Sequence, residues 1–132
     1  MKSNEELLEL AKEVSKRAYC NYSKFPVGAC VLYSNGNYYQ GCNVENSSYG
    51  LSLCAERNAI STAIAAGEKS NIVKIAIYSP SSKKCFPCGA CRQWLQEFEF
   101  GQNIEIILED DDLNCCIYRL NDIFPYSFGL NV

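Results

Sequence analysis

The chain has 132 residues, of which 48% are hydrophobic and 20% charged, a composition typical of globular proteins and not of disordered ones. This length predicts a single domain over residues 1–132. Twelve basic and fifteen acidic residues leave a formal net charge of −3. Because proteins that bind phosphate backbones usually carry clustered positive charge, we expect no nucleic-acid partner.

Cysteine and histidine are used unusually, with nine cysteines and no histidine. An odd number of cysteines cannot pair completely within one chain, and residues 1–6 lack the apolar stretch of a secretory signal. No apolar run reaches the ~20 residues needed to cross a bilayer. We therefore expect a cytoplasmic protein without a membrane partner, whose thiols are free or bound to metal. The lack of histidine excludes imidazole ligands and Ser–His or Cys–His nucleophiles.

The first part of the chain predicts a helix followed by a β-hairpin. Ser3 and Glu6 have the spacing of a capping box at a helix N-terminus. Two short β-type runs, residues 27–33 and 37–42, flank Asn35-Gly36, a pair typical of hairpin turns. The apolar residues that mark the buried face of the helix follow at spacings of three and four, namely Leu7, Ala11, Val14 and Ala18.

The rest of the chain alternates helices and strands. A second helix over residues 53–66 is expected to have Ser52 as its N-cap and Gly67 as its stop. A third helix begins at Pro87 or Cys88 and runs to about Phe98. Helices between strands provide the crossovers that parallel neighbours need, so we predict a mixed sheet with helices on its faces. The remaining strands are expected at 72–78, 103–108 and 115–119, and the short turn between the last two predicts that this pair is antiparallel.

Two segments carry residues suited to metal chemistry. Cys54-Ala55-Glu56-Arg57 begins the second predicted helix, and Pro87-Cys88-Gly89-Ala90-Cys91 begins the third. Cys88 and Cys91, three residues apart, project from one face of a helix. Both segments follow strands or loops at one edge of the sheet. We therefore expect the two helix N-termini to meet and to bring Cys54 against the other two thiols.

Three converging thiolates suit Zn²⁺ and leave the fourth tetrahedral position for water, an arrangement typical of catalytic zinc sites. Glu56 is placed to exchange protons with the metal-bound water, and burial beside the anionic ligands would raise the pKa of its carboxyl group. Zn²⁺ with three thiolates carries a net negative charge. Arg57 is the candidate that compensates this charge, by donating hydrogen bonds to the ligand sulfurs.

Other interpretations of these cysteines stay open. An isolated C-x-x-C is equally consistent with a structural zinc site or a redox pair. Cys85 forms a second C-x-x-C with Cys88. A closed site with four thiolate ligands would then consist of Cys54, Cys85, Cys88 and Cys91. The combination of C-A-E with P-C-x-x-C, in this order, is more specific than either part. The other cysteines are expected to be small apolar core residues: Cys20, Cys30, Cys42, Cys115 and Cys116.

Together these motifs resemble the zinc-dependent cytidine deaminases, in their small form that acts on free nucleosides; the wider signature is ligand-x-Glu followed by P-C-x-x-C. The resemblance covers nearly the whole chain, and it implies a three-layer α-β-α sandwich with a five-stranded mixed sheet. The similar segments outside the metal motif are Phe25-Pro26-Val27-Gly28-Ala29, Asn43-Val44-Glu45-Asn46, Arg92-Gln93 and Phe124-Pro125-Tyr126-Ser127-Phe128-Gly129.

The resemblance implies hydrolytic deamination of cytidine and deoxycytidine to uridine and deoxyuridine, in pyrimidine salvage, with one zinc ion per chain. Glu56 is the implied catalytic residue, which moves protons to N3 of the cytosine ring and then to the leaving amine. Phe25 would stack on the base, and the backbone at Ala55 would hydrogen-bond the pyrimidine edge. Asn43 and Glu45 would hydrogen-bond the ribose.

Small members of this family are homotetramers, so the resemblance also implies a homotetramer in which Tyr49 and Phe128 reach neighbouring subunits. The C-terminal aromatic residues are alternatively explained as the packing of a tail. Three other functions stay open: a deaminase of a cytosine-containing nucleoside antibiotic of the blasticidin type, an enzyme editing cytosine in RNA or DNA, and a non-catalytic zinc-stabilised module. The lack of a basic run argues against the polynucleotide substrate.

Overall fold

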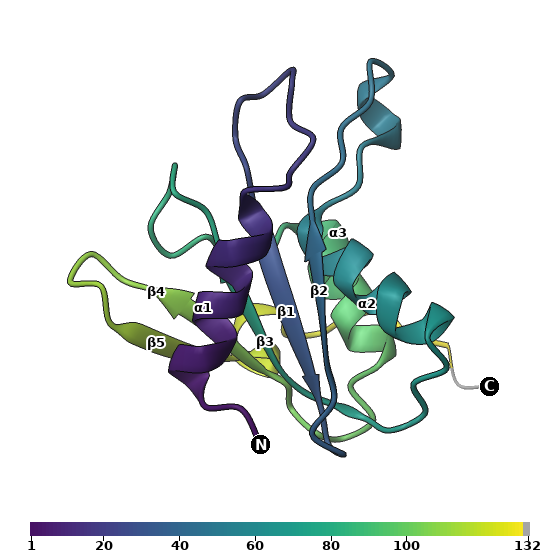
Figure 1. Cartoon of the computed structure of the whole chain (residues 1–132). Coiled ribbons are helices and arrows are strands. Elements are labelled where there is room, and N and C mark those ends of the chain that lie inside the picture. Colours follow the sequence, from purple (N-terminus) through teal and green to yellow (C-terminus); the bar gives the residue numbers. More distant parts are fainter. Residues whose placement is uncertain (131–132) are drawn as a thin grey trace.

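The computed structural model describes residues 1–130 and shows alternating helices and strands (Figure 1). The predicted domain 1–132 includes two residues, Asn131 and Val132, that lie outside the described part. In chain order the elements are α1 (Asn4–Ser15), β1 (Gly28–Tyr33), β2 (Tyr38–Cys42), the 3-10 turn η1 (Tyr49–Leu51), α2 (Ala55–Ala65), β3 (Ile72–Tyr78), α3 (Gly89–Glu97), β4 (Glu105–Glu109), β5 (Cys115–Arg119) and α4 (Leu120–Ile123). None of the described helices has the length and apolar character needed to cross a membrane.

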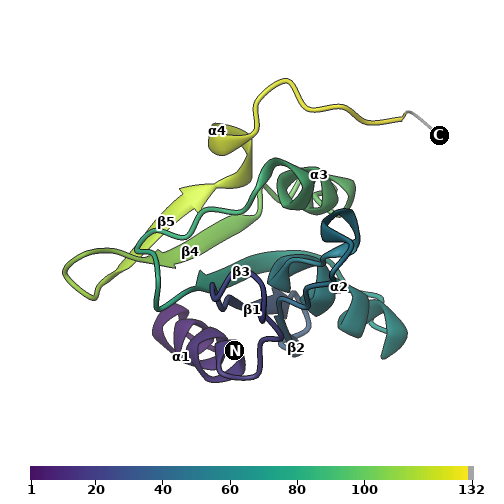
Figure 2. The same cartoon turned by 90° about the horizontal axis from the view of Figure 1, so that it is seen from above.

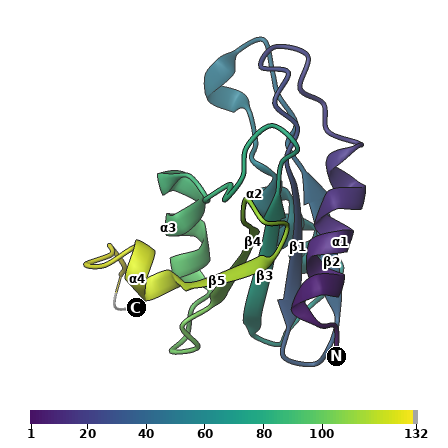
Figure 3. The ribbon, with the colours of Figure 1, turned by 90° about the vertical axis from the view of Figure 1, so that its left-hand side faces the viewer.

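The five strands form one mixed sheet in the order β2-β1-β3-β4-β5. β1 pairs antiparallel with both β2 and β3, β3 pairs parallel with β4, and β4 pairs antiparallel with β5. Helix α1 covers one face of the sheet, while α2 and α3 cover the other (Figures 2 and 3). This confirms the predicted α-β-α sandwich and the antiparallel pairing of the last two strands.

The core has two halves because both faces of the sheet are covered. On the α1 side, Leu7 and Ala11 pack against Cys30 and Leu32 of β1. The alternate residues of β1 point to the other face and pack under α2 and α3. All six residues of β1 are buried, as expected for a strand covered on both faces. Among the five cysteines predicted to be in the core, Cys30 is fully buried, and the other four are only partly buried.

The helix ends agree with the sequence in one case and differ in others. The capping box of α1 is present, because Ser3 Oγ accepts a hydrogen bond from Glu6 N at 3.2 Å and Ser3 N donates to Glu6 Oε1 at 2.9 Å. Ala18 lies beyond the end of α1. The prediction of Ser52 as the N-cap of the second helix is wrong: Cys54 is the N-cap, and the Ser52 hydroxyl accepts from Asn46 N at 3.2 Å.

Gly41 of β2 sets the close approach of α2 to the sheet. A Cβ atom on Gly41 would collide with the backbone nitrogen of Ala59 and the carbonyl oxygen of Ala55. The backbone of α2 therefore lies directly on β2, closer than any side chain would allow. This contact sets the distance between the N-terminal part of α2 and the sheet.

Candidate metal centre and active site

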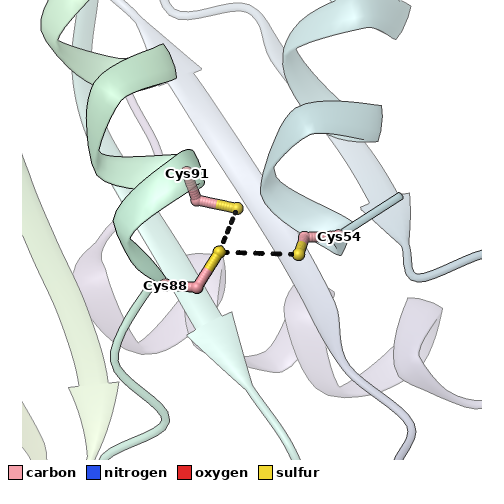
Figure 4. A group of neighbouring side chains, drawn as sticks. All are labelled: Cys54, Cys88 and Cys91. Atoms are coloured by element: carbon pink, nitrogen blue, oxygen red, sulfur yellow. Dashed lines mark hydrogen bonds between the residues drawn. The ribbon is translucent and has the colours of Figure 1, made fainter. Parts of the chain in front are cut away.

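Three thiols meet where α2 and α3 begin. Cys54 is the N-cap of α2, Cys88 is the N-cap of α3, and Cys91 lies in the first turn of α3 (Figure 4). Cys54 Sγ lies 3.8 Å from Cys88 Sγ, and Cys88 Sγ lies 3.5 Å from Cys91 Sγ. Neither N-cap thiol makes a capping hydrogen bond to its own helix. The sulfur atoms are therefore directed at one another, as the sequence predicts.

The sulfur geometry fits a zinc ion. Zn–S bonds of about 2.3 Å at tetrahedral angles hold neighbouring sulfurs roughly 3.8 Å apart. All three sulfur atoms lie within 4.8 Å of one another. Within residues 1–130, no fourth cysteine, aspartate or glutamate joins this group. The set of three donors is therefore that of an open site with one vertex left for water or substrate.

Cys85 does not complete a closed four-thiolate site. Its side chain is partly buried and packs against the core under α2 and α3. Among the described residues, the group of sulfur atoms that lie within 4.8 Å of one another does not include that of Cys85, and burial raises the pKa of the Cys85 thiol to about 11. The alternative that includes Cys85 among the metal ligands is therefore not formed in this structure.

Arg57 and the helix N-termini favour negative charge on the sulfurs. Arg57 Nη2 donates to Cys54 Sγ at 3.3 Å, and the N-terminal ends of α2 and α3 carry partial positive charge. Hydrogen bonds from the Cys91 thiol and from Arg57 lower the pKa of Cys54. Hydrogen bonding to Cys54 and burial raise the pKa of Cys91. These contacts therefore favour the thiolate form of Cys54, which is the form that binds metal.

Glu56 lies beside the thiol cluster in the first turn of α2. Its side chain is only 4% exposed. Burial, followed by the negative charge of Cys54, raises the pKa of Glu56 to about 7. A carboxyl group with a pKa near neutrality both accepts and releases protons readily at neutral pH. The residue type, burial and position therefore suit a proton carrier.

A cavity of about 370 Å³ opens at the cluster. It contains all four predicted substrate-binding residues together with Glu56 and two of the three clustered thiols. Its lining residues are Ser23, Phe25, Val27, Asn43, Glu45, Ser52, Leu53, Cys54, Ala55, Glu56, Cys85, Phe86 and Cys88. Sequence reasoning missed Phe86 as part of this site. The sequence signal was its position directly before Pro87-Cys88, which places it in the connection just before α3.

Asn43 and Glu45 hold the segment that carries Phe25. Asn43 Oδ1 accepts from Val27 N at 2.8 Å, and Asn43 Nδ2 donates to Phe25 O at 2.9 Å. Glu45 Oε1 accepts from the backbone N–H groups of residues 22–23 at 3.1 and 3.0 Å. These contacts give both side chains a structural role that the sequence did not indicate. The second carboxylate oxygen of Glu45 makes none of these bonds.

Tyr49 and Phe128 are not brought into the cavity of their own chain. Tyr49 lies in η1 with 75% of its surface exposed, and Phe128 is 67% exposed. The carbonyl of Phe128 accepts a hydrogen bond from Gln93 Nε2 at 3.0 Å, which ties the C-terminal segment to α3. A contact of either side chain with a neighbouring subunit stays a prediction.

Comparison with known proteins places this site in a family. The model of the cytidine and deoxycytidylate deaminase zinc-binding region matches residues 1–105. A curated probable cytidine deaminase of Dictyostelium discoideum is 43% identical over 125 residues, which cover 95% of this chain and 83% of that protein. A curated cytidine deaminase of Sporosarcina psychrophila is 44% identical over 94 residues, covering 71% of this chain and 68% of that protein.

Comparison with solved structures indicates the same family. The cytidine deaminase of Burkholderia pseudomallei superposes with a TM-score of 0.87 at 37% identity, covering 96% of this chain and 100% of that one. The cytidine deaminase of Mycobacterium tuberculosis superposes with a TM-score of 0.82 at 35% identity, covering 98% and 100%. With the sheet, the thiol cluster and the matched region in agreement, the chain belongs to the cytidine and deoxycytidylate deaminase family of enzymes.

Proposed function

We propose that this protein hydrolyses cytidine and deoxycytidine to uridine and deoxyuridine, with release of ammonia. The observation that carries the proposal is the cluster of Cys54, Cys88 and Cys91 beside the buried Glu56, at a cavity of about 370 Å³. Membership of the deaminase family supports the same reaction.

Cys54, Cys88 and Cys91 are the proposed ligands of one zinc ion per chain. When bound by three protein ligands, zinc supplies a Lewis acid and lowers the pKa of coordinated water to about 7. The hydrogen bond from Arg57 to Cys54 Sγ offsets part of the negative charge that three thiolates concentrate there.

Glu56 is the proposed proton carrier. Its carboxylate accepts a proton from the attacking water, whose oxygen bonds to C4 of the cytosine ring, and passes that proton to N3. It then transfers the second proton of the water to the exocyclic amine, and the bond from C4 to that nitrogen breaks. The products are ammonia and a uracil ring with a carbonyl at C4, so every atom of the water is used. A pKa near 7 lets one carboxyl group perform both transfers.

The nucleoside is proposed to bind along the cavity wall. Phe25 offers an aromatic face to the base, and the backbone at Ala55 offers hydrogen-bonding groups to the pyrimidine edge. Asn43 and Glu45 hydrogen-bond the ribose. The presence of all four residues in one cavity supports this assignment. The curated relatives described above are named cytidine deaminases, which favours the plain nucleoside over a nucleoside antibiotic.

We also propose that the protein acts in pyrimidine salvage as a cytoplasmic homotetramer. The nine free cysteines support a location in a reducing compartment. The exposed rings of Tyr49 and Phe128 support contacts with neighbouring subunits. Sedimentation velocity of the zinc-loaded protein measures the assembly, and a monomer at micromolar concentration would contradict it.

The test compares wild type with Glu56→Gln after both are loaded with zinc. We expect the variant to fold and keep its metal, and to lose roughly 10²–10⁴-fold in rate, because a neutral amide cannot carry the protons. Uridine and ammonia are measured from cytidine, and zinc is measured per chain. Glu13→Gln, an exposed change on α1, is the control expected to retain full rate. A wild type that forms no uridine, or a Glu56→Gln variant that is fully active, would overturn the proposal.

A further inference from the structure

The cavity contains a second aromatic ring besides that of Phe25. Phe86 lies in the connection between β3 and α3, two residues before Cys88, and it lines the same cavity. The ring is 39% exposed, which is high for a large apolar side chain so close to the core. We propose that Phe86 is a substrate-binding residue, which provides an apolar aromatic wall for the pyrimidine base. This inference rests on the proposed deaminase function.

A tyrosine of the sheet fixes the ring of Phe86. The centroids of Phe86 and Tyr118 lie 4.8 Å apart with the ring planes at 63°, an edge-to-face arrangement. Tyr118 belongs to β5 and packs against the core under α2 and α3. Aromatic pairs favour this geometry, so one part of the Phe86 ring is held against the sheet. The rest of the side chain is exposed, and the residue lines the cavity.

The backbone around Phe86 is also anchored. Lys83 Nζ donates to Glu109 Oε1 at 2.6 Å, and Lys84 N donates to Glu109 O at 2.9 Å, so the connection is tied to the end of β4. Phe86 N donates to Lys84 O at 2.7 Å, and Lys84 has a φ of 48°, which is unusual for a non-glycine residue. On the other side, Cys88 is fixed as the N-cap of α3. Phe86 is therefore held in place before any ligand binds.

The chemistry of the wall identifies what it recognises. An aromatic ring offers dispersion and quadrupole contacts to a flat heterocycle but no hydrogen bond to a sugar hydroxyl. Phe86 should therefore contribute equally to the binding of cytidine, deoxycytidine and uridine. Phe86 helps to bind the base and takes no part in proton transfer. Its replacement should therefore change KM and the affinity for the product, and not kcat.

The experiment uses Phe86→Leu, which keeps apolar volume and removes the aromatic ring, and Phe86→Tyr, which keeps the ring. The control is Tyr38→Leu, because Tyr38 is also 39% exposed but lies on β2 and does not line the cavity. Steady-state kinetics give kcat and KM for cytidine and deoxycytidine. Calorimetry gives the affinity for uridine, which binds without reacting, and thermal unfolding gives stability.

We expect Phe86→Leu to raise KM for both nucleosides and to weaken uridine binding by roughly three- to tenfold, with kcat nearly unchanged. Phe86→Tyr and Tyr38→Leu should match the wild type in uridine affinity. Tyr118→Leu should produce a smaller loss in the same direction, because it removes only the support of the ring. The double variant Phe86→Leu/Tyr118→Leu should bind uridine no more weakly than Phe86→Leu alone.

A different pattern would overturn the inference. If Phe86→Leu lowers the unfolding temperature but leaves KM and uridine affinity at wild-type values, Phe86 only packs against Tyr118. A wild type that binds uridine without deaminating cytidine would refute the proposed reaction. In that case a weaker uridine complex of Phe86→Leu would still establish the base contact. A wild type with neither turnover nor uridine affinity would refute both proposals.

Discussion

Arg57 illustrates how one side chain adjusts the charge of the thiol cluster. It lies one helical turn after Cys54, so its guanidinium group reaches back to Cys54 Sγ and to the carbonyl of Ser52, at 3.3 and 3.5 Å. A nearby cation favours the thiolate form of Cys54 over the thiol. The position of Arg57 in the C-A-E-R segment is sufficient to predict this contact, because residues three apart on a helix are neighbours.

Replacing Arg57 by alanine is expected to weaken zinc retention by about 10–100-fold, the range found when partners of metal ligands are removed. The cause is the loss of a donor to Cys54 Sγ, which leaves the charge of the thiolates uncompensated. Competition with a metal chelator measures the zinc affinity. Arg17→Ala, an exposed change beyond α1, is the control. Equal zinc affinity and equal rate in Arg57→Ala and wild type would show that compensation by Arg57 is unimportant.

At the scale of elements, the site depends on how α2 lies on β2. Most of the elements follow from local sequence signals. The capping box begins α1, and Asn35-Gly36 forms the turn of the hairpin. The observed strands differ from the predicted ones only at their ends. The start of α2 is different, because Cys54 and not Ser52 is its N-cap. Sequence preference favours serine at that position, but the structure uses Ser52 to hold Asn46 N instead.

Gly41→Ala tests whether the contact between β2 and α2 positions the site. The added methyl group meets the backbone of Ala59 and Ala55, which cannot move aside as a flexible side chain does. We expect a loss of about 1–3 kcal/mol in the free energy of unfolding, together with weaker zinc binding, because α2 carries Cys54 and Glu56. Urea unfolding measures the first effect and chelator competition the second. Gly50→Ala, in open space, is the control, and an equally stable Gly41→Ala would refute this positioning.

At the scale of the whole molecule, Glu68 connects parts of the fold that are distant in sequence. Its carboxylate accepts hydrogen bonds from Asn35 Nδ2 at 2.9 Å, Asn37 Nδ2 at 3.0 Å and Tyr39 Oη at 2.8 Å, all in or beside the hairpin. It also accepts from the backbone N–H and hydroxyl of Ser70, at 3.0 and 2.7 Å. These donors, first among them the Ser70 backbone, lower the pKa of Glu68 to about 2.

This shift predicts how stability depends on pH. The folded pKa of about 2 lies below the ordinary value of 4.5, so the ionised carboxylate favours the folded state. The contribution is fully present above pH 4.5 and is lost as the pH falls toward 2. We expect Glu68→Gln to be less stable at neutral pH and to lose less stability in acid than wild type does. Urea unfolding of the zinc-free protein at several pH values measures this, and parallel curves for the two proteins would contradict it.

The sequence by itself determined the local features and the identity of the chemical groups. Capping, turn and periodicity signals depend on residues a few positions apart, which is why α1, the hairpin and the β3 strand were predictable. The spacing of C-A-E and P-C-x-x-C was specific enough to select three of nine cysteines, and the structure brings those three together. The short elements η1 and α4 carry too few residues for such signals.

Only the tertiary structure decided which groups face one another. The sulfurs of Cys54 and Cys88 come from residues 34 apart and meet because two helices rest on one face of the sheet. Contacts between segments distant in sequence also keep Cys85 out of the thiol cluster. The same is true of the hydrogen bond from Asn43 to Phe25 and of the packing of Phe86 against Tyr118. Local preference does not encode such contacts, because they are set by the packing of the whole chain and by the burial that this packing imposes.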